Sequence, residues 1–297
     1  MKVSALFLPL ALCCVALSAG AEDLSGTLLK VKESGTLTLG YRESSVPFSY
    51  LDAEGKPVGY AFEVCRAVGE SVKKRLNMPD LKIRYQPVTS ANRIPLIQNG
   101  TVDIECGSTT NSLVRQRQAA FGISYFGIQV SAAVNKNSGI RSFKDLDGNN
   151  SHHHNTMCTI MALLKAYEKK EGIRTRLLMT KDFAESMQLV ANGRADAFIL
   201  DDVLLAGQIA NLSNPDDFMI LDASLSKEPY GPMFRKDDPQ FKALVDETIL
   251  EMIRSGRLAE LYKTWFEKPI PPKNVNLAFP MNQTTKDLFT HPNSDGI

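Results

Sequence analysis

Segments with the periodicity of strands and segments with the periodicity of helices alternate along this chain. In residues 59–76, for example, Cys65, Val68, Val72 and Leu76 recur at spacings of three and four, which predicts an amphipathic helix. Predicted strands lie at residues 36–41, 82–88, 102–106, 176–179 and 195–200, and further helices at 92–99, 162–169, 183–192, 239–255 and 258–266. No tandem repeat is evident. The alternation predicts an α/β fold with two lobes rather than a solenoid.

Three arginines follow the ends of predicted strands in the first 120 residues. Arg42 follows the strand at 36–41, Arg93 the strand at 82–88 and Arg115 the strand at 102–106, and each has serine or threonine nearby. Ligands bind beyond the carboxyl ends of strands in open α/β sheets, and a guanidinium matches a carboxylate in a bidentate way. One arginine taken alone is usually an ordinary surface cation. Together the three predict a pocket for a small molecule with more than one carboxylate.

The first residues have the anatomy of a secretory signal peptide. Lys2 precedes an apolar run at residues 5–17, and Ala-Gly-Ala at 19–21 gives a small-x-small cleavage site. The apolar run is shorter than the about 20 residues of a membrane span. Residues 1–21 are therefore predicted to be removed, and the mature protein to be exported to the periplasm. A lipid anchor at Cys13 or Cys14 is the weaker alternative, because Leu12, which is not small, precedes Cys13.

Composition argues against nucleic acid as a partner. The chain is 43% hydrophobic and 23% charged with a net charge of +1, and it has no basic stripe interleaved with aromatic residues. Three cysteines follow the signal, Cys65, Cys106 and Cys158, and they show no metal-ligand spacing. In an oxidising compartment they allow at most one disulfide. The sequence alone does not identify the pair.

Several long segments resemble the glutamate/aspartate-binding proteins that feed bacterial ABC importers. They are RESSVPFSY, TSANRIPLIQNGTVDIECGSTTN, RQRQAAF, ADAFILDDVLLAG, RKDDPQFK and WFEKPIPPKN, and together they span almost the whole mature chain. The resemblance implies a two-lobed α/β fold of the type II periplasmic binding proteins, with the ligand in the cleft between the lobes. It implies a first lobe of residues 22–130 and 225–297, a second lobe of residues 131–224, and hinge strands near 127–133 and 224–230.

The resemblance also implies the contacts that a bound amino acid would make. Positions that match the family's contacts to the side-chain carboxylate are Arg42, Ser90 and Arg93. Those that match contacts to the α-carboxylate are Arg115, Thr110 and Thr159, and those that match contacts to the α-amino group are Ser108 and Asp201. Three guanidinium groups and one carboxylate are complementary in charge to a glutamate zwitterion, which has two carboxylates and one ammonium group. A neutral amino acid would leave buried arginines unpaired, at a cost of roughly several kcal/mol, so L-glutamate or L-aspartate is expected.

Residues 149–161 depart from the family pattern. The sequence NNSHHHNTMCTIM stands where relatives have an apolar strand and a small loop that holds the α-carboxylate through backbone N–H groups. A local reading-frame error is one hypothesis, which resequencing across codons 148–162 tests. A damaged or redirected second lobe is another. Metal binding by His152, His153 and His154 with Cys158 is a third, but consecutive strand residues point to alternate sides and cannot face one ion together.

Three single positions also bear on the site. Phe183 stands where relatives have a histidine that contacts the side-chain carboxylate, which removes a donor and leaves the preference between glutamate and aspartate open. Pro232 stands where some relatives have a cysteine, which leads to the hypothesis that Cys106 has lost a disulfide partner. Asp201 has a second interpretation as the cap of the helix that enters at Val203, and both interpretations hold if Asp202 is the cap.

The leading hypothesis is a monomeric binding protein without chemistry of its own. It would close about its hinge on an acidic amino acid and then dock on the inner-membrane permease of an ABC transporter. One alternative is a degenerate relative that no longer binds. Another is a dehydratase-like enzyme on the same fold, for which Cys158 and His154 are the Cys/His pair closest in sequence. No catalytic residue, metal or cofactor is expected.

Overall fold

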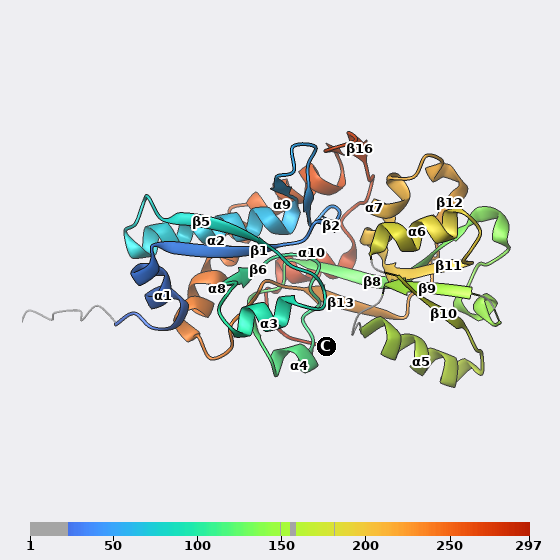
Figure 1. The fold of residues 1–297 in the computed structure, drawn as a ribbon, viewed down its shortest axis with the longest axis horizontal. Coiled ribbons are helices and arrows are strands. Elements are labelled where there is room, and N and C mark those ends of the chain that lie inside the picture. Colours follow the sequence, from blue (N-terminus) through green and yellow to red (C-terminus); the bar gives the residue numbers. More distant parts are fainter. Residues whose placement is uncertain (1–22, 149, 155–158, 181) are drawn as a thin grey trace, which may run out of the picture.

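The computed structural model describes residues 23–148, 150–154, 159–180 and 182–297, with the backbone alone at 150–154 and 159. The predicted signal peptide therefore lies outside the described residues. Two sheets organise the described chain and lie one after the other along its long axis (Figure 1). We call the part built around the five-stranded sheet lobe 1 and the part built around the six-stranded sheet lobe 2. No helix of the described ranges is long and apolar enough to cross a membrane.

The sheet of lobe 1 has the strand order β5-β1-β6-β14-β7. Its strands are β1 (Thr36–Tyr41), β5 (Lys82–Pro87), β6 (Ile104–Glu105), β7 (Ala120–Phe121) and β14 (Met233–Phe234). β1 pairs in parallel with β5 and with β6. β14 comes from late in the chain and pairs antiparallel with β6 and β7. Lobe 1 therefore contains segments from both ends of the described chain.

Helices cover the sheet of lobe 1. They are α1 (Gly26–Ser34), α2 (Tyr60–Leu76), α3 (Arg93–Gln98), α4 (Leu113–Gln116), α8 (Pro239–Arg254), α9 (Arg257–Phe266) and α10 (Gln283–Thr290). In α2 the predicted positions Cys65, Val68 and Val72 are buried. α8 begins as predicted, with Pro239 in its first turn and the Asp238 carboxylate accepting the N–H of Phe241 at 3.3 Å.

A disulfide joins α2 to the end of β6. Cys65 on α2 is bonded to Cys106, which directly follows β6, and their Cα atoms are 5.6 Å apart. The hypothesis that Cys106 has lost its partner is therefore wrong. The bond fixes α2 beside the segment that leads into Gly107 and Ser108.

Lobe 2 is a six-stranded sheet with helices on both sides. Its strands are β8 (Phe126–Asn135), β9 (Asn150–His154), β10 (Arg176–Thr180), β11 (Ala197–Asp201), β12 (Phe218–Ile220) and β13 (Ser226–Tyr230). The order is β10-β9-β11-β8-β12, with β13 also paired to β8. In Figure 1, α5 (Thr159–Glu171) lies on one side, and α6 (Phe183–Ala191) and α7 (Asp202–Ala210) lie on the other. The polar segment 150–154 thus supplies the strand between β10 and β11.

Two antiparallel strands run between the lobes. β13 pairs with β8 over residues 126–130, and the rest of β8 pairs with β11 and β12. An isolated bridge then joins Tyr230, at the end of β13, to Thr110 of lobe 1. These two strands contain the segments predicted as hinge passages.

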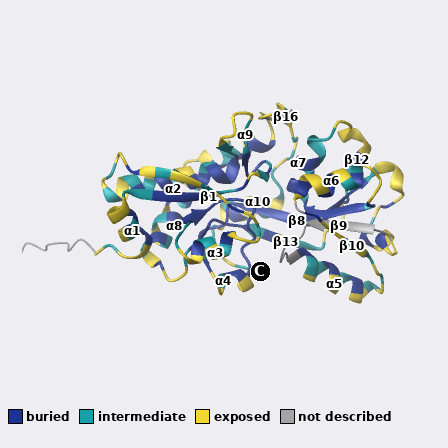
Figure 2. Cartoon of the chain, viewed as in Figure 1, coloured by how far each residue is buried: buried dark blue, intermediate teal, exposed yellow. Residues whose placement is uncertain are grey.

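Short elements and the end of the chain complete lobe 1. They are β2 (Ser44–Ser45), β3 (Ser49–Leu51), β4 (Pro57–Val58), β15 (Pro269–Ile270) and β16 (Val275–Asn276); short 3₁₀ turns of lobe 2 are Lys136–Ser138, Phe143–Leu146 and Pro215–Asp217. The last residues return to α4: the Leu113 N–H donates to the Ile297 carbonyl at 2.8 Å, and the Ile297 N–H donates to the Asn111 carbonyl at 3.2 Å. The C-terminus lies beside α4 in Figure 1. Figure 2 shows that the core follows central strands such as β1, β8 and β11, whereas the edge strands β5 and β10 are largely exposed.

Candidate functional site

The predicted residues of lobe 1 meet at one edge of its sheet. β5, β1 and β6 are neighbouring parallel strands, so their carboxyl ends lie together. Nη1 of Arg42 donates to Oγ of Ser90 at 3.0 Å, and Nη1 of Arg93 donates to the carbonyl of Ser108 at 3.3 Å. Oγ of Ser108 also donates to Oγ of Ser45 at 3.2 Å. The structure therefore brings these side chains together, as the positions after strand ends predicted.

Arg93 is the most deeply enclosed of the three arginines, with 3% of its surface exposed. Its Nη1 also donates to the hydroxyl of Thr109, and that hydroxyl donates to Oε2 of the fully buried Glu105 at 2.6 Å. Its Nε is buried and has no hydrogen-bond partner among the described residues. An unsatisfied buried donor costs about 1–3 kcal/mol. An acceptor oxygen brought by a ligand would remove that cost.

Arg42 contacts lobe 2 through an aromatic ring. Its guanidinium carbon lies 5.9 Å from the centre of the Phe183 ring, at the start of α6, within the range of a cation–π contact. Its backbone N–H donates to Oγ of Ser49 at 2.9 Å, which fixes the turn after β1. Phe183 cannot donate a hydrogen bond to a ligand. It instead covers the arginine from the opposite lobe with an apolar surface.

Arg115 and Thr110 form the third part of the lobe 1 site. Nη1 of Arg115 donates to the carbonyl of Thr110 at 2.8 Å, and Ser112 caps the short helix α4 that carries the arginine. The hydroxyl of Thr110 donates to Oε2 of Glu228 at 2.8 Å. Glu228 lies on β13, so this contact ties a predicted ligand residue to one of the strands between the lobes.

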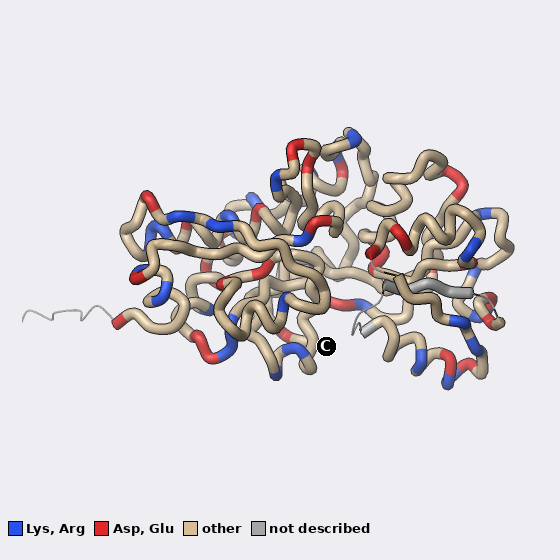
Figure 3. Tube along the Cα trace, in the orientation of Figure 1, with Lys and Arg blue, Asp and Glu red and all other residues tan. Residues whose placement is uncertain are grey.

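Asp201 reaches the same region from lobe 2. It ends β11 and accepts a hydrogen bond from the hydroxyl of Tyr230. Burial raises the pKa of Asp201 well above its ordinary value, the negative charges of Glu228 and Asp202 raise it further, and the positive charges of Arg115 and Arg93 oppose the rise. Charged positions of both signs accordingly lie where the two lobes meet (Figure 3).

The two neighbouring aspartates have different roles in the structure. The Asp202 carboxylate accepts the N–H of Val203 at 2.8 Å and the N–H of Gln129 at 3.2 Å. Asp201 occupies the cap position of α7 but makes no side-chain capping hydrogen bond. Asp202 therefore satisfies the backbone at the helix start, and the carboxylate of Asp201 is directed elsewhere.

The departing segment lies largely outside the described residues. Thr159 is the first residue of α5, but its side chain is among those not described. The same holds for the side chains of His152, His153 and His154, and for Cys158 as a whole. The hypothesis of a metal site there therefore concerns side chains outside those that the structure describes. Among the described residues, no group of three or more His, Cys, Asp or Glu side chains is placed to hold a metal ion.

Sequence reasoning missed Glu105, Glu228 and Tyr230. Glu228 and Tyr230 form hydrogen bonds with Thr110 and Asp201, and Glu105 is linked to Arg93 through the hydroxyl of Thr109. Glu105 and Glu228 lie within strands, where a buried carboxylate is rare unless it is paired. An acidic residue inside an otherwise strand-like segment was thus the available signal.

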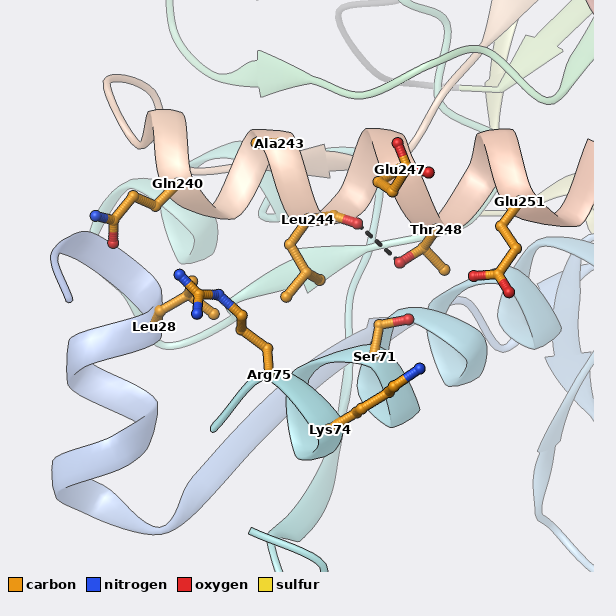
Figure 4. Close-up of a pocket in the computed structure, with 10 residues that line it drawn as sticks. All are labelled: Leu28, Ser71, Lys74, Arg75, Gln240, Ala243, Leu244, Glu247, Thr248 and Glu251. Carbon is orange, nitrogen blue, oxygen red and sulfur yellow. Dashed lines mark hydrogen bonds between the residues drawn. The ribbon is translucent and has the colours of Figure 1, made fainter. Parts of the chain in front are cut away.

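A separate cavity lies on the outer side of lobe 1. It has a volume of about 560 Å³ and lies between α2 and α8, with Leu28 of α1 at one end (Figure 4). Lys74 and Arg75 on α2 face a wall of α8 that carries Glu247 and Glu251. None of its lining residues belongs to the predicted ligand set.

Comparison with known proteins gives the family. The family model of the bacterial extracellular solute-binding proteins, family 3, matches residues 37–268. The chain belongs to this family. A "L-glutamate/L-aspartate-binding protein" of Pseudomonas aeruginosa is 44% identical over 98% of this chain and 97% of its own length. A "Glutamate/aspartate import solute-binding protein" of Escherichia coli K12 is 42% identical over 97% of both chains.

Solved structures agree on the architecture of this family 3 solute-binding protein. An ancestral arginine-binding protein bound to glutamine has a TM-score of 0.68 and 25% identity, over 78% of this chain and 98% of its own. AncCDT-1, an ancestral amino acid-binding protein described as a precursor of cyclohexadienyl dehydratase, has a TM-score of 0.70 and 26% identity, over 81% of this chain and 99% of its own. The predicted fold class, two α/β lobes with a ligand cleft and a two-strand hinge, is confirmed.

Proposed function

We propose that this protein captures L-glutamate or L-aspartate outside the cytoplasm and delivers it to the permease of an ABC importer. The observation that carries the proposal is the set of buried arginines. Arg42, Arg93 and Arg115 lie at one edge of one sheet, and Nε of Arg93 is buried without an acceptor among the described residues. Carboxylates satisfy guanidinium groups in a bidentate way. The relatives from P. aeruginosa and E. coli are named for binding these same two amino acids.

In this proposal the ligand connects the two lobes. Arg42, Ser90 and Arg93 hold its side-chain carboxylate, and Arg115, Thr110 and Thr159 hold its α-carboxylate. Ser108 and Asp201 hold its ammonium group. Because Asp201 and Phe183 come from lobe 2 and the arginines from lobe 1, a ligand between them stabilises the closed arrangement. The closed form is the one that the permease recognises.

The same proposal divides the chain into a signal peptide and two lobes. Residues 1–21 are a signal peptide that is removed on export to the periplasm. Residues 22–130 and 225–297 form lobe 1, residues 131–224 form lobe 2, and the protein moves about β8 and β13. It works as a monomer without a cofactor. The pairing of β14 with β6 and β7 supports a return of the chain to lobe 1 after residue 224.

Isothermal titration of the mature protein with L-glutamate, L-aspartate and L-glutamine tests the proposal. We expect micromolar or tighter binding of the two acidic amino acids and much weaker binding of glutamine, whose amide leaves a guanidinium unpaired. Equal affinity for glutamine would show that the arginines do not make the protein prefer acidic amino acids. A folded sample that binds none of the three would identify a relative that has lost its ligand.

A turnover experiment separates this proposal from an enzyme on the same fold. The ligand is incubated with protein in equal amounts, released by denaturation and identified by mass spectrometry. We expect it to return unchanged, because the role proposed here is capture and delivery. Conversion of the amino acid into any product would favour the dehydratase-like alternative.

A further inference from the structure

The pairing of three strands places four polar side chains on one face of the lobe 2 sheet. Val130 of β8 is paired with Asp201 of β11 on one side and with Ser226 of β13 on the other. Side chains at paired positions point to the same face, and so do residues two apart along a strand. The side chains that share this face are those of Asp201, Ser226, Glu228 and Tyr230.

Hydroxyl groups connect the two carboxylates of this face to their surroundings. Ser226 donates to Oε1 of Glu228 at 2.8 Å, and Thr110 donates to Oε2 of Glu228 at 2.8 Å. The hydroxyl of Tyr230 donates to Oδ2 of Asp201. Glu228 is 1% exposed and Asp201 is 7% exposed. Two carboxylates are therefore buried at the junction of the lobes.

Charged groups surround the pair from every side. Asp202 lies at the start of α7, Arg115 on α4 and Arg93 on α3, and all three act on Asp201 along with Glu228. Two carboxylates close together do not both ionise easily in a buried site. A proton on Asp201 relieves the repulsion, and so does a cation placed against the two carboxylates. The ammonium group of an amino acid is such a cation.

We propose that Glu228 joins Asp201 in a two-carboxylate subsite for the ligand's ammonium group, an inference that rests on the proposed function. When the ammonium binds, it takes the place of a proton held by Asp201. That proton passes to the solvent buffer, so that capture of the amino acid is coupled to proton release. No covalent bond forms or breaks.

Glu228 also decides what Thr110 can offer a ligand. A threonine hydroxyl has a single proton, and Thr110 donates it to Glu228. What remains on the Thr110 oxygen is its capacity to accept. In this arrangement the Thr110 oxygen can accept an ammonium hydrogen, and its hydroxyl donates to the α-carboxylate only after it turns away from Glu228.

Titration of the wild type and of Glu228→Gln with two ligands tests the subsite. L-glutamate has two carboxylates and an ammonium group, and glutarate has the same two carboxylates without it. For the variant we expect the affinity for L-glutamate to fall roughly 10- to 100-fold and that for glutarate to stay the same or rise. Repeating the titrations in phosphate and in Tris, whose ionisation heats differ, gives the number of protons released. We expect release from the wild type and less from the variant.

Matched controls make the outcomes distinct. Glu54→Gln removes the same charge from an exposed position and should leave both affinities and the proton count unchanged. Failure of the wild type to bind L-glutamate would overturn the proposed function itself. Two outcomes would overturn only the subsite, provided that the wild type binds L-glutamate normally. In one, Glu228→Gln has the same affinities and proton release as the wild type; in the other, it loses equal affinity for L-glutamate and for glutarate. The number of protons that the wild type releases on binding is measured without any variant. If no protons are released at any neutral or mildly acidic pH, the subsite is also overturned.

Discussion

At the scale of single residues, the three arginines are held in different ways. Arg42 has Ser90 on one side and the ring of Phe183 on the other. Arg115 is held by the carbonyl of Thr110. Arg93 is linked through the hydroxyl of Thr109 to a buried carboxylate, that of Glu105. The Glu105 charge offsets that of Arg93 and orients its guanidinium plane. Ligand binding at Arg93 should therefore depend on the planar arrangement of its N–H donors.

Arg93→Lys tests that dependence. The variant keeps the charge but loses the planar fork, so we expect the dissociation constant for L-glutamate to rise about 10- to 100-fold. Binding of L-glutamine should not improve. Arg84→Lys makes the same change at an exposed position of β5 and should have little effect. Isothermal titration measures both, and equal affinities for the two variants would show that Arg93 does not contact the ligand.

Asp202 predicts a pH dependence of stability. Burial raises its pKa to about 6, although backbone N–H groups of Gln129 and Val203 lower it in part. A carboxyl with a raised pKa in the folded state stabilises the fold below its unfolded pKa of about 3.9, and this contribution is lost as the pH rises through 6. Relative to Asp202→Asn, the free energy of unfolding of the wild type should therefore fall by about 1–3 kcal/mol between pH 4 and 7.

Urea unfolding of the wild type and of Asp202→Asn at several pH values measures this difference. Asp222→Asn, at an exposed position, serves as the control for a change of charge alone. A difference between wild type and Asp202→Asn that stays constant with pH would mean that Asp202 ionises normally in the fold.

At the scale of elements, the disulfide between α2 and the end of β6 supports the ligand edge. The cysteines are 41 residues apart in sequence, and closing such a loop stabilises a fold by about 2–4 kcal/mol. We expect the double variant Cys65→Ala/Cys106→Ala to lose this much unfolding free energy and to melt at the same temperature with or without reductant. The wild type should melt lower when reduced. A wild-type melting temperature that does not change with reductant would argue against the disulfide.

The long elements could be predicted from the sequence because their periodicity is local. α2 and α8 match the predicted helices at 59–76 and 239–255 within one residue at each end, and β1 matches exactly the predicted 36–41. α1 was missed because it buries only Thr27, Leu28 and Val31 and lacks a continuous apolar stripe. β7 and β14 have two residues each, too few to show a period.

Residues of the candidate site could be predicted from the sequence only where they follow the end of a strand. Arg42, Arg93 and Ser108 follow strands, and the rule for parallel sheets brings such positions together. Glu228 and Tyr230 lie within a strand, and their contacts with Thr110 and Asp201 depend on how β13 and β11 pair with β8. That register joins segments far apart in the chain, and no local pattern specifies it.

At the scale of the whole molecule, lobe 2 contacts lobe 1 through Phe183 and through α7 as well as through β8 and β13. Phe183 covers Arg42, and α7 approaches the segment between β2 and β3 so closely that a Cβ on Gly207 would lie 2.7 Å from the carbonyl oxygen of Val46. That distance is too short for a real contact. The absence of a side chain at Gly207 is therefore a condition of this arrangement of the two lobes.

Gly207→Ala should hinder closure without weakening α7. Alanine favours a helix over glycine, but its methyl group would push the lobes apart, and overpacking of about 1 kcal/mol or more corresponds to an affinity loss of roughly fivefold or more. Gly69→Ala in α2 is the matched control, since its Cβ would meet Ile83 at an ordinary 3.6 Å. Titration gives the affinity, and X-ray scattering should show less compaction with L-glutamate for Gly207→Ala than for Gly69→Ala.

The return of the last residues to α4 has a practical consequence. Ile297 exchanges backbone hydrogen bonds with Asn111 and Leu113, which lie between Thr110 and Arg115. A fluorescent dye attached after Ile297 would therefore sit beside the segment that is proposed to hold the α-carboxylate. The emission of such a dye would report occupancy of the cleft, and an affinity tag for purification belongs at the opposite end of the mature chain.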